Sequence, residues 1–329
     1  MSEHLLIDQL EQALERLLTA GEREHLEALN PALAALLDVA RELRHLPRSA
    51  FRNRLKADLE RSRTTMHVED HTTTSRPAGF RAVTPYMIVQ DAPALIDFVT
   101  RTFGGEERHR AIGSAGGLHA EVRIGNSMVM IGGGAPDLQW RGTSMPTALH
   151  VYVEDVDAAF RRALSAGATP IYKPMDHDYG ERSGGVRDPG GNHWYIATAT
   201  GPHHVPAGLH TVNICLHPVR GEAVIAFLER AFGARTLEKV ASSEGAIQHA
   251  KVAIEDSVLE IGDAHGPFQP MPTMFYVFVA DVDAAYERAL AAGATTISAP
   301  ADQPYGNRTA GVQDAFGNQW YVAAPVRRN

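Results

Sequence analysis

The sequence predicts an α+β fold in which one strand-rich unit occurs twice. Three observations lead to this prediction. Two segments match closely at a spacing of 126 residues, VEDVDAAFRRALSAGATPIYKP from Val153 and VADVDAAYERALAAGATTISAP from Val279. Short apolar or alternating runs, typical of strands, are interspersed with segments of helical spacing in both copies. The chain of 329 residues is 44% hydrophobic and 21% charged, a globular composition that can bury a core.

The two copies extend well beyond this match. TPYMIVQDAPALIDFVTRTFGG from Thr84 parallels TVNICLHPVRGEAVIAFLERAFGA from Thr211, which we align with two extra residues in its second turn. LHAEVRIGNSMVMIGGG parallels QHAKVAIEDSVLEIGDA, and the copies end in DYGERSGGVRDPGGNHWYIA and PYGNRTAGVQDAFGNQWYVA. We therefore predict two domains, at residues 80–200 and 206–326.

Each copy is expected to run strand, helix, strand, strand, strand, and then to repeat that order. Gly125-Asn126 is a two-residue link typical of a hairpin, and Gly167 is a suitable residue to follow a helix. In the first copy the elements that we can locate are a strand at 86–89, a helix at 92–103, strands at 118–124 and 128–131, a strand at 151–153, a helix at 156–166 and a strand at 192–197.

Residues 1–63 are predicted to form a separate, small all-α segment. Leucines recur at three- and four-residue steps between Leu6 and Leu18, a second stripe runs from Leu33 to Leu43, and Ser49 suits the start of a third helix. Residues 64–79 have little apolar content and end in Pro-Ala-Gly, which indicates a flexible linker. The helices are expected to pack or dimerise, with a regulatory partner surface as the alternative.

The charge balance and the absence of several motifs exclude broad classes of function. The net charge is −8, with 31 basic and 39 acidic residues, which gives no footprint for nucleic acid or an anionic membrane. The sequence shows neither a signal peptide nor an apolar run long enough for a membrane span, and its one cysteine, Cys215, excludes a disulfide within the chain and a Cys-rich metal site. We expect a cytoplasmic bacterial protein with a small-molecule partner, without nucleic-acid or membrane partners.

The motifs TPYMIVQDA, HAEVRIGNS, YVEDVDAAFRRALSAGA and YGERSGGVRDPGGNHWYIA, with their second-copy partners, resemble those of the vicinal-oxygen-chelate (glyoxalase/bleomycin-resistance) superfamily. The similarity is strongest to its PhnB-like members, and it covers about three quarters of the chain. It implies two tandem domains, each of paired βαβββ modules that form a cup-shaped sheet with a ligand in the cup. It also implies an intrachain pseudo-dimer, and a further homodimer remains open.

In metal-dependent members of that superfamily, the ligands lie on the first and last strands of each module. Carried onto this sequence, the positions are Thr84, Met130, Ala148 and Tyr195 in the first domain and Thr211, Glu260, Met274 and Tyr321 in the second. Only Glu260 is a usual ligand for a divalent ion, and one carboxylate cannot hold such an ion alone. The resemblance therefore predicts no standard metal site and no cofactor. A nonstandard iron, zinc or manganese site is the less favoured alternative.

Strand alternation predicts which side chains face each cup. In the first domain they are Tyr86, His119, Glu121, His150, His193 and Tyr195. In the second domain they are Thr211, Asn213, His249, Lys251, Glu260, Tyr276, Gln319 and Tyr321. Lys251 falls opposite Glu260, and a cross-strand ion pair is the favoured interpretation of that carboxylate. We predict that these residues contact the ligand.

Three of these residues, His119, Glu121 and His150, are the candidate catalytic groups. Histidine titrates near neutral pH, and a carboxylate in a cavity can serve as its acid or base partner. The alternative is that each histidine is an ordinary strand residue satisfied by the backbone. Arg182 and Arg308 lie in two Tyr-Gly-x-Arg loops, where each guanidinium could clamp an anionic ligand or fix a turn through an ion pair.

These observations favour a small-molecule-binding protein of the glyoxalase/bleomycin-resistance type, which acts by sequestration or resistance without the standard metal site. One alternative is an enzyme, a lyase, isomerase or oxygenase, that uses the His/Glu cluster of the first domain with or without a divalent metal. The other is a regulatory protein that acts through the N-terminal helices.

Overall fold

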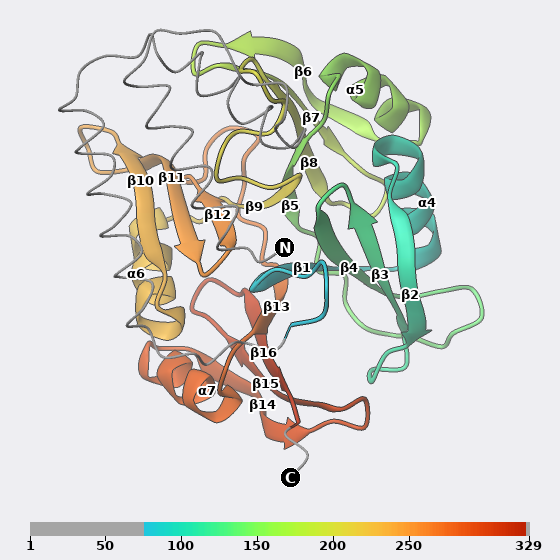
Figure 1. Ribbon diagram of the computed structural model, residues 1–329, viewed down its shortest axis with the longest axis vertical. Helices are drawn as coiled ribbons and strands as arrows, with labels where there is room; N and C mark the ends of the chain where they lie inside the picture. Colours follow the sequence, from blue (N-terminus) through green and yellow to red (C-terminus); the bar gives the residue numbers. More distant parts are fainter. Residues whose placement is uncertain (1–75, 327–329) are drawn as a thin grey trace, which may run out of the picture. The chain divides into compact units, whose positions relative to one another are not determined.

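The computed structural model describes residues 76–326, which form two eight-stranded sheets and four helices (Figure 1). The predicted helices of residues 1–63, and all but the last residues of the predicted linker, lie outside the described residues. The first repeat comprises β1 (Val83–Val89), α4 (Ala92–Phe103), β2 (Glu106–Ile112), β3 (Leu118–Ile124), β4 (Ser127–Gly133), β5 (Ala148–Tyr152), α5 (Val156–Ser165), β6 (Thr169–His177), β7 (Glu181–Arg187) and β8 (His193–Ala199). The second repeat comprises β9 (Val212–Leu216), α6 (Gly221–Phe232), β10 (Arg235–Ala241), β11 (Ile247–Ile254), β12 (Ser257–Ile261), β13 (Met274–Phe278), α7 (Val282–Ala291), β14 (Thr295–Asp302), β15 (Asn307–Gln313) and β16 (Gln319–Pro325).

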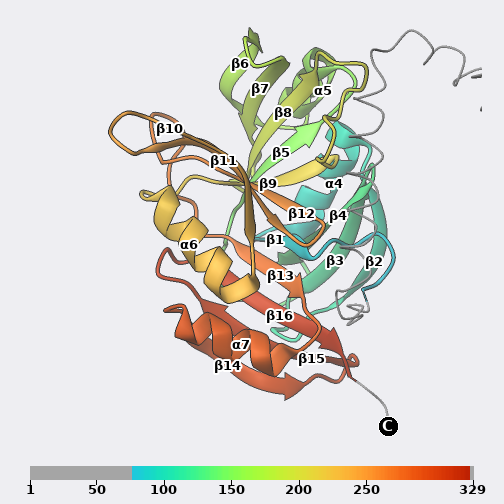
Figure 2. The same ribbon diagram turned by 60° about the vertical axis from the view of Figure 1, so that its left-hand side comes forward.

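Each sheet takes half of its strands from each repeat. Sheet A has the order β14-β15-β16-β13-β1-β4-β3-β2, and sheet B has the order β10-β11-β12-β9-β5-β8-β7-β6 (Figures 1 and 2). Antiparallel pairing of β1 with β13 joins the two halves of sheet A, and antiparallel pairing of β5 with β9 joins the two halves of sheet B. The expectation that the two modules of one repeat share a cup is therefore wrong. The repeat pattern identifies the four modules, but it does not indicate which two modules pair to form one sheet.

The helices, in contrast, stay with their own repeat. α4 packs against α5, and α6 packs against α7. Trp194 lies in sheet B, yet its ring contacts Phe98 in the middle of α4 and Phe103 at the end of that helix, with the Phe103 centroid 5.0 Å away. Trp320 makes the equivalent contacts in the second repeat, and both indoles are fully buried. Both tryptophans are therefore core residues beneath the helices.

Local sequence signals account for the helix and hairpin boundaries. Asp91, Asp155 and Asp281 each cap the start of a helix by accepting a hydrogen bond from a backbone N–H three residues later. α4 then ends at Gly104, whose left-handed φ of 69° suits glycine. The predicted hairpin turn at Gly125 joins β3 to β4, and the ladder between these strands places Glu121 opposite Met130.

A serine directly after the β3–β4 turn and another directly after the β11–β12 turn each bind the first strand of the other repeat. Ser127 Oγ accepts a 3.0 Å hydrogen bond from Val212 N, and Ser257 Oγ accepts a 2.8 Å hydrogen bond from Val83 N. This symmetry equates Val83 with Val212, and therefore Thr84 with Asn213. The alignment of Thr84 with Thr211 is wrong, because the two extra residues precede the strand.

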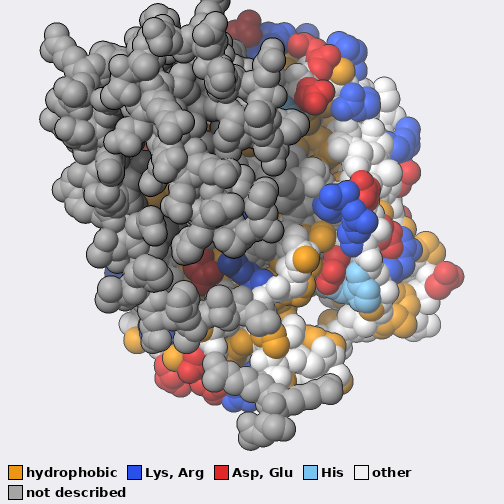
Figure 3. All heavy atoms as spheres, viewed as in Figure 1, with side chains coloured by type: hydrophobic (Ala, Val, Ile, Leu, Met, Phe, Trp, Pro, Cys, Tyr) orange, Lys and Arg blue, Asp and Glu red, His pale blue; other side chains and the backbone are white. Residues whose placement is uncertain are grey.

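The outer strands carry charges that discourage further strand pairing. β2, at one edge of sheet A, is exposed along its whole length. Charged side chains of both signs gather over β2 and β3 (Figure 3), and exposed ion pairs join Glu107 to Arg110 and Glu106 to Arg123. Charged edge strands of this kind resist edge-to-edge association. No helix among residues 76–326 is long and apolar enough to cross a membrane.

Candidate functional site

Each sheet packs one face against helices and leaves the other face for a site. In β3, Leu118, Ala120 and Val122 are buried on the helix side, while His119 and Glu121 alternate with them on the opposite face. We call this opposite face cup A in sheet A, where it carries Tyr86, His119, Glu121, Met130, Tyr276, Asn307 and Tyr321. The same face of sheet B is cup B, where it carries His150, Glu181, His193, Tyr195, Asn213, Cys215, His249, Lys251 and Glu260.

The predicted cups are therefore divided differently. The candidate catalytic set of His119, Glu121 and His150 does not converge, because the first two lie in sheet A and His150 lies in sheet B. Tyr276 and Tyr321 likewise lie in sheet A, apart from Asn213 and Glu260 with which they were grouped. The alternation within each strand was correct, and the error lies wholly in the pairing of modules.

Cup A is aromatic and half-buried. Tyr86 OH and His119 Nδ1 share a 2.7 Å hydrogen bond, and His119 Nε2 lies 3.7 Å from Glu121 Oε1. Across the cup, Asn307 Nδ2 donates to Tyr276 OH at 3.1 Å. Burial raises the pKa values of the Tyr86 and Tyr276 phenols, so both remain protonated donors at neutral pH.

The deeper part of cup A is apolar. Phe80, Met128, Met130 and Phe278 form a buried cluster, and the half-buried rings of Tyr86 and Tyr276 pack against it. The Phe80 and Phe278 rings meet edge to face, with centroids 5.6 Å apart. The cup thus combines an apolar floor with a rim of hydroxyl, imidazole and carboxylate groups.

Cup B instead holds a buried ionisable cluster. His150 Nδ1 lies 2.9 Å from Glu260 Oε2, and His150 Nε2 lies 3.6 Å from Glu181 Oε2. Tyr152 OH donates to Glu181 Oε1 at 2.6 Å. His150 is only 9% exposed and Glu260 only 8%. Two carboxylates therefore flank one imidazole out of contact with most solvent.

The two partners change each other's protonation. Burial alone would lower the pKa of His150, but the charge and hydrogen bond of Glu260 outweigh burial and raise it. Burial would also raise the pKa of Glu260, but the His150 imidazolium lowers it below its usual range. We describe the pair as an imidazolium–carboxylate ion pair that is buried at neutral pH.

Cys215 adjoins this pair from β9. Its Sγ lies 3.9 Å from Glu260 Oε2, and burial together with that carboxylate raises the pKa of the thiol. Lys251 does lie opposite Glu260 in the ladder, as predicted. The expected Lys251–Glu260 ion pair is nevertheless wrong, because Lys251 Nζ contacts Glu238 Oε2 at 3.1 Å on the exposed neighbouring strand. The imidazole of His150 takes the place that was expected for the ammonium group.

Apolar side chains close over cup B. Tyr172, Phe268 and Met271 pack against Tyr195 and Cys215. Several buried polar atoms beneath them have no hydrogen-bond partner among the described residues. They are Tyr195 Oη, Glu260 Oε1 and both ring nitrogens of His217. Burying such groups without a partner is costly, so cup B has unmet capacity for hydrogen bonds or ligation.

Sequence reasoning missed Glu181 and chose its neighbour instead. Arg182 points to the helix side, where it makes two hydrogen bonds to Asp157 at 2.7 and 3.0 Å. Arg308 is held in the same way by Asp283. Of the two alternatives, the ion pair is the arrangement observed. Alternation from Arg182 would have placed Glu181 in the cup, so the signal was present in the Tyr-Gly-Glu-Arg motif itself.

Equivalent positions in the two cups carry different chemistry. His150 of cup B corresponds to Tyr276 of cup A in the repeat. Glu260 pairs with Cys215 in sheet B as Met130 pairs with Tyr86 in sheet A. Glu260 therefore corresponds to Met130, and Cys215 corresponds to Tyr86. Three donors of cup B therefore stand where cup A has tyrosine or methionine. The remaining predicted residues of cup B, His193 and His249, are half-buried, and burial lowers the pKa of His193.

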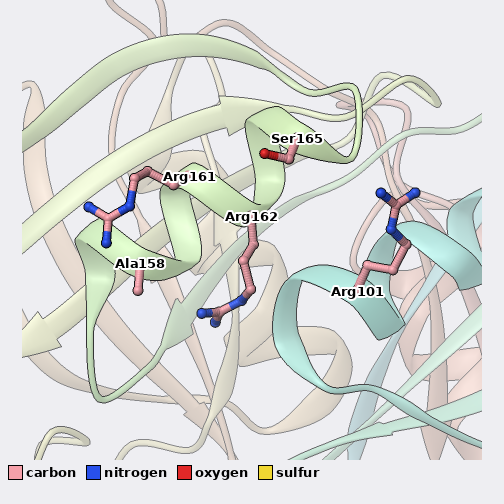
Figure 4. Close-up of a pocket in the computed structure, with 5 residues that line it drawn as sticks. All are labelled: Arg101, Ala158, Arg161, Arg162 and Ser165. Carbon is pink, nitrogen blue, oxygen red and sulfur yellow. The ribbon is translucent and has the colours of Figure 1, made fainter.

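Two cavities lie outside the cups. One, of about 360 Å³, is lined on α4 and α5 by Arg101, Ala158, Arg161, Arg162 and Ser165 (Figure 4). Arg162 Nε donates to Thr102 O and Arg101 pairs with Asp97, so two of its three guanidinium groups are already engaged. The other cavity, of about 380 Å³, includes His217 and Met271 in its wall. It therefore adjoins cup B, since both residues also pack on the aromatic closure of that cup.

The positions that hold metal in the family do not fit a metal here. In cup A they are Thr84, Met130, Met274 and Tyr321, and none is a usual ligand for a divalent ion. In cup B they are Ala148, Tyr195, Asn213 and Glu260, where the carboxylate is again alone. The expectation of no standard site is consistent with these side chains.

The sequence was compared with protein families and with known proteins. A family model described as the Glyoxalase/Bleomycin resistance protein/Dioxygenase superfamily matches residues 70–196 and 218–322. An uncharacterised protein of Mycobacterium bovis is 40% identical over 123 residues, which span 35% of this chain and 81% of that protein. An uncharacterised protein of Mycobacterium tuberculosis is also 40% identical over 123 residues, covering 72% of its length.

Solved structures show the same fold. Glyoxalase I from Zea mays aligns with a TM-score of 0.55 at 18% identity, and the alignment covers 74% of this chain and 92% of that chain. A point mutant of the same maize enzyme aligns with a TM-score of 0.56, also at 18% identity and with the same coverage of both chains. Both repeats are thus matched in sequence, and both sheets have counterparts in one glyoxalase chain. The chain belongs to the glyoxalase/bleomycin resistance protein/dioxygenase superfamily.

Proposed function

We propose that the protein binds a small molecule in cup A and acts by sequestration, without a metal at that site. The observation that carries the proposal is the half-buried aromatic face formed by Tyr86, Tyr276 and Tyr321 over the apolar cluster around Met130. Aromatic surface with a few convergent polar groups is typical of a ligand site. The side chains of cup B, in contrast, are already covered by Phe268 and its neighbours.

The chemistry of cup A indicates the ligand class. Flat, mostly apolar molecules can stack on the tyrosine rings, since offset or edge-to-face ring contacts are favourable. Tyr86, His119 and Glu121 form one connected polar edge, which suits a ligand with a hydrogen-bond donor or a positive charge. Family members include resistance proteins as well as enzymes, and the aromatic cup, whose family metal positions carry no usual ligand, favours binding over turnover.

Titration calorimetry against a panel of flat aromatic and peptide antibiotics tests the proposal. The expected result is saturable binding at one site per chain without chemical change of the ligand. Tyr321→Ala should weaken binding by about 1–2 kcal/mol, roughly five- to thirty-fold in Kd, because it removes one ring from the cup. His249→Ala is the control, because His249 is half-buried in cup B and should not affect a ligand in cup A.

Two outcomes would contradict the proposal. One is equal loss of affinity in Tyr321→Ala and His249→Ala, which would place the ligand elsewhere. The other is steady conversion of the ligand that Glu121→Gln abolishes, which would favour an enzyme that uses the Tyr86–His119–Glu121 edge. The regulatory alternative rests on residues 1–63, and deletion of those residues with unchanged affinity and oligomeric state would argue against it.

A further inference from the structure

We propose that cup B binds a divalent metal ion, zinc by preference, through His150, Cys215 and Glu260. Among the described residues, these three side chains form a group whose potential ligand atoms all lie within 4.8 Å of one another. They come from β5, β9 and β12, adjacent strands at the centre of sheet B. The site therefore draws on both repeats, since β5 belongs to the first and the other strands to the second.

The proposed set differs from the positions used by the family. Only Glu260 occupies a family position. His150 and Cys215 each lie two residues along their strands from Ala148 and Asn213, and hence on the same face of the sheet. The ladder places Ala148 opposite Cys215 and His150 opposite Asn213. The proposed donors are thus shifted along the two central strands, which the family pattern would not reveal.

The separations suit a small tetrahedral ion. Ligand bonds to zinc of about 2.0–2.3 Å imply ligand-to-ligand distances of about 3.3–3.8 Å. The observed distances from Glu260 Oε2 are 2.9 Å to His150 Nδ1 and 3.9 Å to Cys215 Sγ, which bracket that range. A metal would displace the proton between His150 and Glu260 and the thiol proton of Cys215. The third separation, between His150 and Cys215, is at most 4.8 Å, so the site would contract by up to about 1 Å on that side to reach tetrahedral geometry.

The charge and donor types also match. A thiolate and a carboxylate supply two negative charges, which neutralise a divalent ion in a site that is nearly closed to solvent. Imidazole, thiolate and carboxylate are all zinc ligands, and three protein ligands leave a fourth position open. Glu260 Oε1 is buried and has no partner among the described residues, so it is available to a second bond or to a group at the fourth position.

Neighbouring residues supply support and access. Glu181 Oε2 lies 3.6 Å from His150 Nε2, so the imidazole can face the metal with one nitrogen and a carboxylate with the other. Such outer carboxylates orient ligating histidines. The cavity of about 380 Å³ has His217 and Met271 in its wall, so it lies next to the side chains that cover the proposed site.

Cobalt substitution tests the proposal with a readout that needs no substrate. Full-length protein is stripped with chelator and titrated with Co²⁺, and a near-ultraviolet thiolate-to-cobalt charge-transfer band is recorded. Cys215 is the only cysteine of the chain, so the band has one possible source. We expect one Co²⁺ per chain, displaced by one Zn²⁺. Saturation with Co²⁺ or Zn²⁺ without such a band, or with a band that survives in Cys215→Ser, would overturn the proposal.

Three variants separate loss of a ligand from loss of folding. Glu260→Gln should lower Zn²⁺ affinity by more than the about 10- to 100-fold loss typical of outer-shell partners. His119→Gln is the matched control in cup A and should bind Zn²⁺ as the wild type does. Zn²⁺ should also raise the melting temperature of the wild type and His119→Gln but not of Cys215→Ser. If Zn²⁺ shifts all three equally, the ion binds elsewhere and the proposal is wrong.

Discussion

Glu260→Met in metal-free protein is expected to lower the free energy of unfolding by about 3 kcal/mol at pH 7. The substitution removes one side of a 2.9 Å ion pair in which both side chains are about nine-tenths buried. Removal of one partner of such a pair typically costs about 3–5 kcal/mol, because the other charge stays buried. We expect the lower end for Glu260→Met, since Glu181 at 3.6 Å still compensates His150.

His150→Tyr should cost more, about 4–5 kcal/mol, because the Glu260 carboxylate then loses its buried partner while its Oε1 atom already lacks one. The double variant carries the residues that cup A has at the same two positions, Met130 and Tyr276. With both charges gone, the pair is replaced by side chains of a size that this fold already accommodates. We expect the double variant to lie within about 1–2 kcal/mol of the wild type.

Urea unfolding followed by tryptophan fluorescence is a suitable assay. All three tryptophans lie within residues 76–326, and Trp194 and Trp320 are fully buried. In a unit of this size, 1 kcal/mol corresponds to about 2–4 °C in melting temperature, so the single variants should also melt about 6–20 °C lower. If the costs of the single variants simply add in the double variant, the two side chains are not coupled, and the buried ion pair does not exist as described.

Three further predictions concern other parts of the fold. Burial, aided by nearby histidines, lowers the pKa of His217 from 6.5 to about 4, so the unfolded chain binds the proton more readily than the folded chain. The contribution of His217 to stability should therefore be fully present above pH 6.5, and the free energy of unfolding should fall by about 2 kcal/mol between pH 7 and pH 5. Urea titrations at both pH values should show that His217→Gln abolishes this loss. Asp314→Ala should cost about 1–3 kcal/mol, because the buried Trp320 indole N–H then loses its 2.9 Å acceptor; an unchanged urea midpoint would contradict this. Gly133→Ala should cost at least about 1–3 kcal/mol in the same assay, because φ is 124° and the added Cβ would meet the carbonyl oxygen of Val89.

Much of the local structure could be predicted from the sequence. The 92–103 helix and the 118–124 strand have the bounds that were predicted, and Glu121 lies opposite Met130. These features depend on interactions between residues close in the chain: helical periodicity, a capping aspartate and a two-residue turn. The alternation of side chains within each strand follows from the same short-range geometry, and it placed His119 beside Glu121 correctly.

The composition of the site could be predicted only in part. Most residues of the two cups were identified, but His150 was grouped with His119 and Glu121, which lie in the other sheet. Cys215 was not among the predicted site residues, although its sulfur adjoins Glu260. A contact of this kind depends on which strand lies beside β5, and no short-range pattern determines that choice. Glu181 was missed for a different reason, because attention went to the arginine next to it.

Sequence patterns alone were enough to identify a duplicated strand-rich unit, the residues that lie under the helices, and the residues that alternate to the opposite face. Those properties follow from composition and periodicity, which act over a few residues. The combination of modules from both repeats in each sheet could be seen only in the folded chain, because four similar modules offer equivalent edges and long-range packing selects among them. That selection brought His150 to Glu260 and Cys215 and left the tyrosines together in the other cup. Two copies of one unit thereby acquired an aromatic site and an ionisable site.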